Sequence, residues 1–205
     1  MLKKMNLPNK LTCLRIVLVP VFVVFMALPI EWVWTKWVAH GLYIVASLTD
    51  CADGYISRKY DMVTKFGKIM DPLADKLLVA AGFIMLAGLN IIPAWIAMII
   101  IFRDLCVTSF RIFGAEGKQD VAANFSGKIK TVFQLIGICL AILGVALYTS
   151  NNAFGDFLFT SVNMTMFQLM INVLMSVSIC VAVIFTIWSL VDYFFKFKNN
   201  INIEE

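Results

Sequence analysis

Residues 50–75 read DCADGYISRKYDMVTKFGKIMDPLAD and place four aspartates inside a chain that is otherwise strongly apolar. Asp50 and Asp53 are three residues apart, and Asp71 and Asp75 are four apart. On helices these spacings put each pair on one face, about one turn apart, so that two such faces can meet as one acidic cluster. Four unpaired aspartates near membrane-helix centres would cost about 10 kcal/mol or more on insertion scales. The pattern therefore predicts bound cations and access to water.

The composition predicts an integral membrane protein. Of the 205 residues, 61% are hydrophobic and 15% are charged, which is too little polar surface to cover a water-soluble globule. Six apolar stretches are expected to form transmembrane helices, and several are long enough to span a hydrocarbon core of about 30 Å. These stretches cover residues 16–30, 37–57, 69–90, 92–112, 128–149 and 166–195. We expect one all-α membrane domain over residues 1–205, with an N-terminal interfacial helix within residues 1–15.

The positive charges predict which side of the membrane each helix end faces. Of the 17 Lys and Arg residues, all except Lys36 lie near the N-terminus, the turn between spans two and three, the connection between spans four and five, or the C-terminus. By the positive-inside rule these ends are cytoplasmic, and so are both termini. The acidic cluster should then face the cytoplasm. The net charge of +4 reports topology, and binding of nucleic acid is not expected.

The aspartates suit two divalent cations, Mg²⁺ or Mn²⁺. These ions prefer oxygen ligands, and Mg²⁺ usually binds through a few carboxylates together with water and substrate phosphates. Two such ions about 3.5–4 Å apart can polarise a phosphorus centre and stabilise a leaving phosphate. Gly54, next to Asp53, removes a side chain where a ligand could approach the backbone closely. The sequence therefore predicts metal-assisted cleavage of a diphosphate bond.

The spacing of these residues resembles the signature of one family, the CDP-alcohol phosphotransferases, D-x2-D-G-x2-A-R-x8-G-x3-D-x3-D. Every spacing in residues 50–75 matches, and the one departure is Ser57 where the family usually has alanine. The resemblance implies a six-span fold with cytoplasmic ends, a homodimer and a location in a bacterial cell membrane. It also implies transfer of a phosphatidyl group from CDP-diacylglycerol to an alcohol, with release of CMP.

Carried over by position, the resemblance assigns roles to single residues. Four carboxylates would hold the two cations: Asp50, Asp53, Asp71 and Asp75. Asp75 would also be the general base that takes the proton from the acceptor hydroxyl. A further set would lie against the CDP moiety: Asn9, Thr12, Gly54, Ser57, Arg58 and Gly67. The lipid tails of the donor would remain in the bilayer.

Basic residues at the ends of spans four and five predict a phosphate on the acceptor. Four of them lie on the same side as the aspartates: Arg103, Arg111, Lys128 and Lys130. Arginine can bind phosphate bidentately and lysine as a point charge, and Arg103 is expected to face inward together with Asp104. Together with the opening residues 6–15, the resemblance implies sn-glycerol 3-phosphate as the acceptor. Serine, inositol phosphate and phosphatidylglycerol are alternative acceptors, and topology alone also demands basic residues at these ends.

Two other interpretations of the aspartates stay open. They could form interhelical salt bridges with nearby cations, for which Arg58, Lys68 and Lys76 are the candidates. Intramembrane aspartates also mark ion paths, and a cation transporter would distribute acidic residues through the depth of the membrane. Here the aspartates gather toward one side, which favours the transferase.

Overall fold

The computed structural model describes residues 7–59, 65–116, 125–150 and 166–200, which contain six α-helices. The helices are α1 (Leu7–Ala27), α2 (Val33–Lys59), α3 (Lys65–Gly88), α4 (Ala94–Glu116), α5 (Phe125–Ser150) and α6 (Met166–Asn200). Their lengths run from 21 to 35 residues, enough to cross a hydrocarbon core of about 30 Å at about 1.5 Å per residue. Each predicted apolar stretch overlaps one of these helices, so the all-α prediction is confirmed over the described residues.

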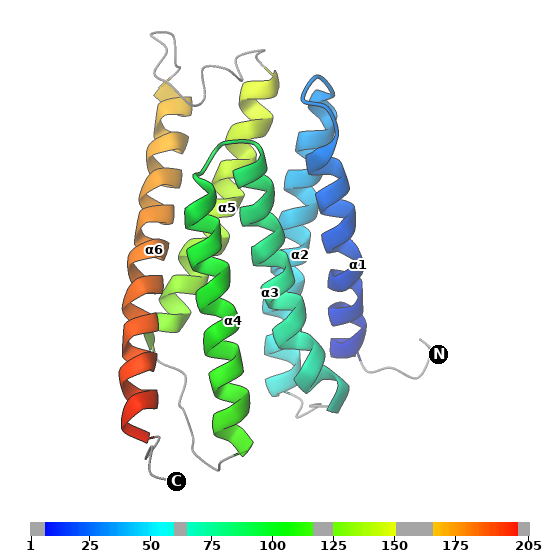
Figure 1. Cartoon of the computed structure of the whole chain (residues 1–205). Coiled ribbons are helices and arrows are strands. Elements are labelled where there is room, and N and C mark those ends of the chain that lie inside the picture. The colour runs from blue at the N-terminus through cyan, green and yellow to red at the C-terminus, as the bar shows by residue number, and fades with distance from the viewer. Residues whose placement is uncertain (1–6, 60–64, 117–124, 151–165, 201–205) are drawn as a thin grey trace.

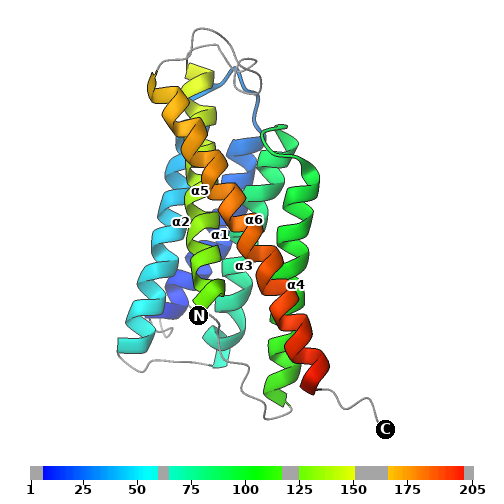
Figure 2. The same ribbon diagram turned by 90° about the vertical axis from the view of Figure 1, so that its left-hand side faces the viewer.

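The helices pack side by side into one elongated bundle (Figure 1). α5 contacts α2, α3 and α6, while α1 packs against α2 and α3, and α4 packs against α3 and α6. Figure 2 shows α6 leaning across the bundle from α5 toward α4. The start of α1, the end of α2, the start of α3 and the end of α6 all lie at one end, the lower end in Figure 1. Segments that are far apart in the sequence therefore meet there.

The bundle buries polar side chains and exposes apolar ones. Arg15, Arg103 and Lys130 are buried, whereas large apolar side chains such as Met98 and Trp188 are exposed. Water-soluble proteins rarely expose so much apolar surface, and lipid tails can cover it. Within the described residues, three helical segments are long and apolar enough to cross a membrane: Asn9–Ala27, Ile129–Thr149 and Leu169–Asp192. The chain is therefore a helical membrane protein.

The structure differs from the prediction at the N-terminus. Residues 7–15 do not form a separate interfacial helix but are the first turns of α1, which runs unbroken to Ala27. Pro8 fits this first turn, because the N–H that proline lacks has no partner within a helix there. The polar face of the segment is buried against protein and contains Asn9, Thr12 and Arg15. An amphipathic face can lie at the membrane interface or pack against other helices, and here it packs inside the bundle.

The tight turn between α3 and α4 follows from Asn90. Its φ of 58° lies in the left-handed region, which asparagine tolerates at a helix C-terminus. The N–H of Ile91 donates to the carbonyl of Leu86, and the N–H of Asn90 to that of Ala87, each at 3.0 Å, as in a Schellman motif. Ile91 and Leu86 are both buried, which adds the apolar contact that usually accompanies this motif. The turn makes α3 and α4 antiparallel neighbours.

Lys36 caps α1 at the end of the bundle opposite the aspartates. Its Nζ donates to the carbonyl of Met26 at 2.8 Å and to that of Leu28 at 2.7 Å. The last carbonyls of a helix have no partner within it, and a cation at this end is also favoured by the helix dipole. The one basic residue that the charge pattern sets apart therefore has a local structural role.

Glycines let α5 approach its neighbours closely. A Cβ at Gly82 of α3 would lie 2.8 Å from Cγ2 of Ile138 on α5. A Cβ at Gly137 of α5 would lie 3.1 Å from Cγ1 of Ile179 on α6. Small residues at such crossings are typical of packed membrane helices, because they let the backbones come together.

We expect Gly82→Val to lower the melting temperature of the purified protein in detergent. The branched side chain cannot fit against Ile138 unless a helix moves, and overpacking of this kind costs about 1–3 kcal/mol. Gly41→Val is the matched control, because a Cβ at Gly41 of α2 meets nothing within 4 Å. Equal melting temperatures for the two variants would contradict the close α3–α5 crossing.

Candidate active site

Three of the four predicted metal ligands lie together near the lower end of the bundle. Asp50 is in the lower half of α2, and Asp71 and Asp75 are in the lower half of α3. Both α3 carboxylates are near enough to Asp50 for their charges to act on it. The three carboxylates therefore lie in one region of the bundle, and their shared role as metal ligands stays a prediction. The side chain of Asp53, the fourth ligand, lies outside the described part of the structure.

α1 supplies partners for two of these aspartates. Arg15 donates from Nη1 to Oδ1 of Asp50, and the hydroxyl of Thr12 donates to Oδ1 of Asp71 at 2.6 Å. Both donors are fully buried, so the two contacts hold the carboxylates in place from one side. The Arg15–Asp50 pair was not predicted from the sequence. The available signal was the spacing of three between Thr12 and Arg15, which puts both on one face of α1.

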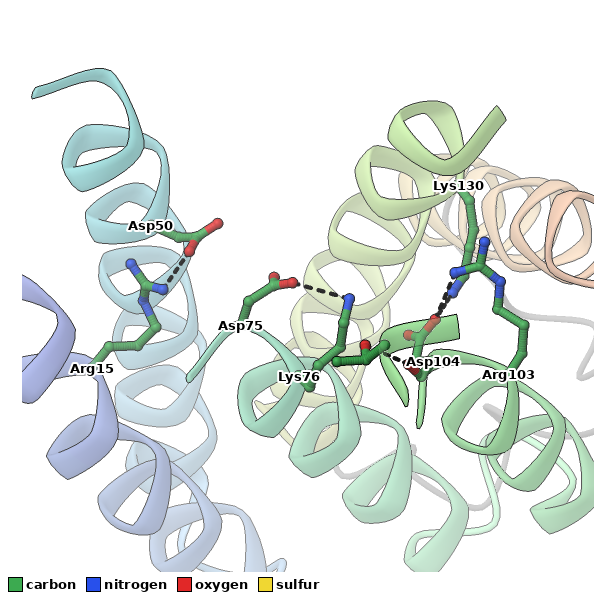
Figure 3. Close-up of polar contacts among 8 residues, drawn as sticks. Arg15, Asp50, Asp75, Lys76, Arg103, Asp104 and Lys130 are labelled. Atoms are coloured by element: carbon green, nitrogen blue, oxygen red, sulfur yellow. Dashed lines mark hydrogen bonds and ion pairs between the residues drawn. The ribbon is translucent and has the colours of Figure 1, made fainter. Parts of the chain in front are cut away.

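Asp75 points from α3 into the space between Asp50 and Lys76 (Figure 3). Its Oδ2 accepts a hydrogen bond from Nζ of Lys76 at 3.1 Å. The side chains of Asp75 and Lys76 are 25% and 28% exposed, so this ion pair is partly solvated and contributes little to stability. Asp75 and Lys76 both belong to α3, so their pair is not the interhelical salt bridge considered as an alternative, and the side chains of Arg58 and Lys68 lie outside the description.

The metal site itself stays a prediction. Among the side chains that the structure describes, no group of three acidic, histidine or cysteine residues is arranged to hold a metal ion. The described carboxylates are nevertheless oxygen donors of the kind that Mg²⁺ and Mn²⁺ prefer. Their two cationic partners, Arg15 and Lys76, neutralise two of three charges, so the described cluster still favours a cation.

A second polar cluster lies where α4, α5 and α6 meet. Oδ1 of Asp104 accepts a hydrogen bond from Nη1 of the neighbouring Arg103 at 3.1 Å and another from Nζ of Lys130 on α5 (Figure 3). Nη2 of Arg103 donates to the hydroxyl of Ser189 on α6. Arg103 and Asp104 are 5% exposed, Lys130 is 1% exposed and Ser189 is fully buried. We call these four residues the basic cluster.

The basic cluster contains two of the four predicted phosphate-binding residues. Arg103 faces inward together with Asp104, as predicted, and Lys130 joins them from the next helix. The side chains of Arg111 and Lys128 lie outside the described residues. Ser189 was missed, and its sequence neighbours carry no signal for it, because the face that α6 turns inward depends on how the bundle packs.

Lys76 connects the two clusters. It pairs with Asp75 on one side, and its charge acts on Lys130 on the other. Figure 3 shows Lys76 between Asp75 and Asp104. The carboxylates of α2 and α3 therefore adjoin the buried cations of α4 and α5. Such an arrangement can hold metal cations on one side and a phosphate on the other.

The predicted CDP-binding residues are only partly described. Asn9 and Thr12 are buried on α1, and Thr12 contacts the acidic cluster through Asp71. The surroundings of the remaining four lie outside the description: Gly54, Ser57, Arg58 and Gly67. The CDP site therefore stays a prediction.

The sequence pattern of a known family, CDP-alcohol phosphatidyltransferase, matches residues 5–188. The chain belongs to this family. The matched range contains both acidic faces of the signature and all four predicted phosphate-binding residues, so the family resemblance extends over nearly the whole bundle.

Three members of the family show how far the similarity reaches. The chain is similar to the CDP-diacylglycerol–glycerol-3-phosphate 3-phosphatidyltransferase of Bacillus subtilis, with 45% identity over 148 residues, which are 67% of this chain and 77% of the relative. A protein of the same name from Haemophilus influenzae is 30% identical over 195 residues, 93% of this chain and 92% of the relative. The one from Escherichia coli K12 is 34% identical over 138 residues, 65% and 74% of the two chains.

Proposed function

We propose that this chain is an enzyme that transfers the phosphatidyl group of CDP-diacylglycerol to sn-glycerol 3-phosphate, which yields phosphatidylglycerol phosphate and CMP. The observation that carries the proposal is the acidic cluster of α2 and α3 next to the buried Arg103–Asp104–Lys130 network in a membrane bundle. Membership of the family supports the reaction class, and the names of the bacterial relatives support the donor and the acceptor.

The reaction exchanges one phosphorus–oxygen bond for another. The hydroxyl oxygen of the acceptor attacks the phosphorus that carries diacylglycerol, and a new P–O bond forms there. The bond from this phosphorus to the bridging oxygen breaks, and CMP leaves with the electron pair. Asp75 takes the hydroxyl proton, because it is partly exposed and its single described hydrogen bond leaves lone pairs that can accept.

Two divalent cations, Mg²⁺ or Mn²⁺, would be held by the carboxylates of the signature: Asp50, Asp53, Asp71 and Asp75. When bound, such cations neutralise the diphosphate and stabilise the charge that develops on the leaving CMP. Thr12 and Arg15 keep Asp71 and Asp50 oriented from α1. The CDP moiety would lie nearby, against Asn9 and Thr12 and against the signature residues Gly54, Ser57, Arg58 and Gly67.

Arg103 and Lys130 would bind the phosphate of the acceptor, with Arg111 and Lys128 in the same role at the helix ends. Because Arg103 and Lys130 are buried, their charges are screened less than those of surface residues. Serine has no phosphate and would bring only a singly charged carboxylate to these two cations. The basic cluster therefore favours a phosphorylated acceptor.

The membrane topology belongs to the same proposal. All six helices would cross the bilayer, with both termini and the two polar clusters on the cytoplasmic side. The charge pattern supports this orientation, since Lys36 alone among the basic residues is assigned to the other side. The protein would work as a homodimer in a bacterial cytoplasmic membrane.

The test is release of CMP from CDP-diacylglycerol by the purified protein in detergent micelles, with labelled sn-glycerol 3-phosphate as acceptor. We expect product only when both substrates are present. Activity should fall to background with excess EDTA and return when Mg²⁺ or Mn²⁺ is added in excess, because the carboxylates need cations to bind the diphosphate.

Competing acceptors are assayed under the same conditions. A preference for serine, inositol phosphate or phosphatidylglycerol would replace the proposed acceptor and keep the reaction class. If no acceptor supports CMP release with either cation, the transferase is rejected. A flux of Mn²⁺ into vesicles that contain the protein would then favour a cation transporter.

A further inference from the structure

We propose that Asp104 is a positioning residue that holds Arg103 and Lys130 in the geometry in which they bind the acceptor phosphate, and that Ser189 completes this arrangement. The inference rests on the function proposed above. It starts from one juxtaposition, in which a single carboxylate oxygen of α4 receives a hydrogen bond from each of two buried cations.

The two cations need an anion between them. Arg103 on α4 and Lys130 on α5 lie near enough to repel each other, and both are almost completely buried. Repulsion between like charges is strong where little water screens it, so without a partner the two side chains would move apart. Oδ1 of Asp104 binds both and keeps them together.

The network also fixes how the guanidinium is oriented. Asp104 binds Nη1 of Arg103 from its own helix, and Ser189 binds Nη2 from α6. Two contacts on different nitrogens set the plane of the group, and a bidentate contact with phosphate depends on that plane. Ser189 therefore acts on the acceptor through Arg103.

Asp104 leaves the cluster able to attract an anion. One carboxylate neutralises one of the two cations, so Arg103, Asp104 and Lys130 together carry one net positive charge. Nζ of Lys130 has three N–H donors, of which Asp104 accepts one. Donors thus remain on Lys130 for a phosphate oxygen.

An alternative is that Asp104 competes with the phosphate for these cations. Removing a competitor would tighten binding of the acceptor, whereas removing a positioning residue would weaken it. The two roles therefore predict opposite signs for Asp104→Asn, a substitution that removes the charge at nearly constant volume.

The experiment compares steady-state kinetics of the full-length wild type and Asp104→Asn, with CDP-diacylglycerol and sn-glycerol 3-phosphate varied in turn. We expect KM for sn-glycerol 3-phosphate to rise roughly tenfold or more, with kcat and KM for CDP-diacylglycerol within about threefold of wild type. Calorimetric titration of sn-glycerol 3-phosphate into the protein should show the same loss of affinity. An unchanged or lower KM for this acceptor would overturn the positioning role.

Ser189→Ala provides a second variant, which decides the question if Asp104→Asn does not fold. It should raise the same KM by roughly threefold, because one neutral partner of Arg103 is lost. Thr186→Val is the matched control, since Thr186 is buried one turn earlier on α6 and its hydroxyl donates at 2.6 Å to Ala182 of the same helix. Equal KM values for these two variants would also overturn the proposal.

The failure of this inference can be told apart from failure of the proposed function. If wild-type protein releases no CMP in response to sn-glycerol 3-phosphate, the proposed function fails. If the wild type uses this acceptor and both variants keep its KM, only the positioning role fails.

Discussion

Asp75→Asn is expected to lower CMP release by about 10²–10⁴-fold, the range typical for loss of a general base, or further if metal binding is also weakened. The substitution would delete the proposed proton acceptor and replace one proposed metal ligand by an uncharged amide of nearly the same volume. The amide oxygen can still accept the hydrogen bond that Lys76 donates, so we expect the bundle to fold. The measurement is the single-turnover rate at saturating substrates, together with the melting temperature.

Glu31→Gln is the control for this substitution. It makes the same carboxylate-to-amide change at an exposed residue in the connection between α1 and α2, at the opposite end of the bundle. Its rate should equal that of wild type. If Asp75→Asn kept a wild-type single-turnover rate, Asp75 would be neither the base nor a required ligand.

The helices of this fold could be predicted from the sequence because the bilayer imposes a length and a composition on them. Each apolar stretch is long, and backbone groups in lipid must be paired within a helix. The start of α1 could not be predicted in the same way. Its polar residues Asn9, Thr12 and Arg15 suit a membrane interface and a polar protein interior equally well, and only packing against α2 and α3 decides between them.

The acidic faces could be predicted because they depend on the spacing of residues that are close together in the sequence. The spacing of Asp71 and Asp75 puts both on one face of one helix. The negative charge of these aspartates inside a membrane protein requires cationic partners. The partners themselves are set by tertiary structure. Arg15 lies 35 residues from Asp50, and Ser189 lies 86 residues from Arg103, so no periodicity in the sequence joins them.

Lys36 illustrates the same limit at the other end of the bundle. The charge pattern sets it apart and assigns it to the outer side, but this pattern says nothing about its contacts. The structure shows that Lys36 binds the last carbonyls of α1, which requires the turn between α1 and α2 to bring it back over that helix end. The contacts with these carbonyls therefore explain why a lysine lies on the outer side, which the positive-inside rule does not explain.

Arg103→Ala is expected to raise KM for sn-glycerol 3-phosphate by at least roughly 30-fold, from a loss of about 2 kcal/mol or more when one partner of a buried charge pair is removed. The variant loses the planar donor proposed to bind the phosphate and leaves Asp104 with Lys130 as its described partner. KM for CDP-diacylglycerol should change little, because the site proposed for the donor is the acidic cluster. Phe102→Leu is the control, since Phe102 precedes Arg103 on α4 and is exposed on the apolar surface.

Arg103→Lys separates charge from geometry at the same position. A lysine keeps the positive charge but presents no planar fork, so it cannot bind Ser189 and Asp104 through two nitrogens while facing a phosphate. If fixed geometry matters, its KM for sn-glycerol 3-phosphate should lie nearer that of Arg103→Ala than that of wild type. If charge alone attracts the acceptor, Arg103→Lys should behave as wild type at low ionic strength and lose affinity as salt is added. Unchanged acceptor kinetics in both variants would assign Arg103 to membrane topology and to packing of α4 against α6.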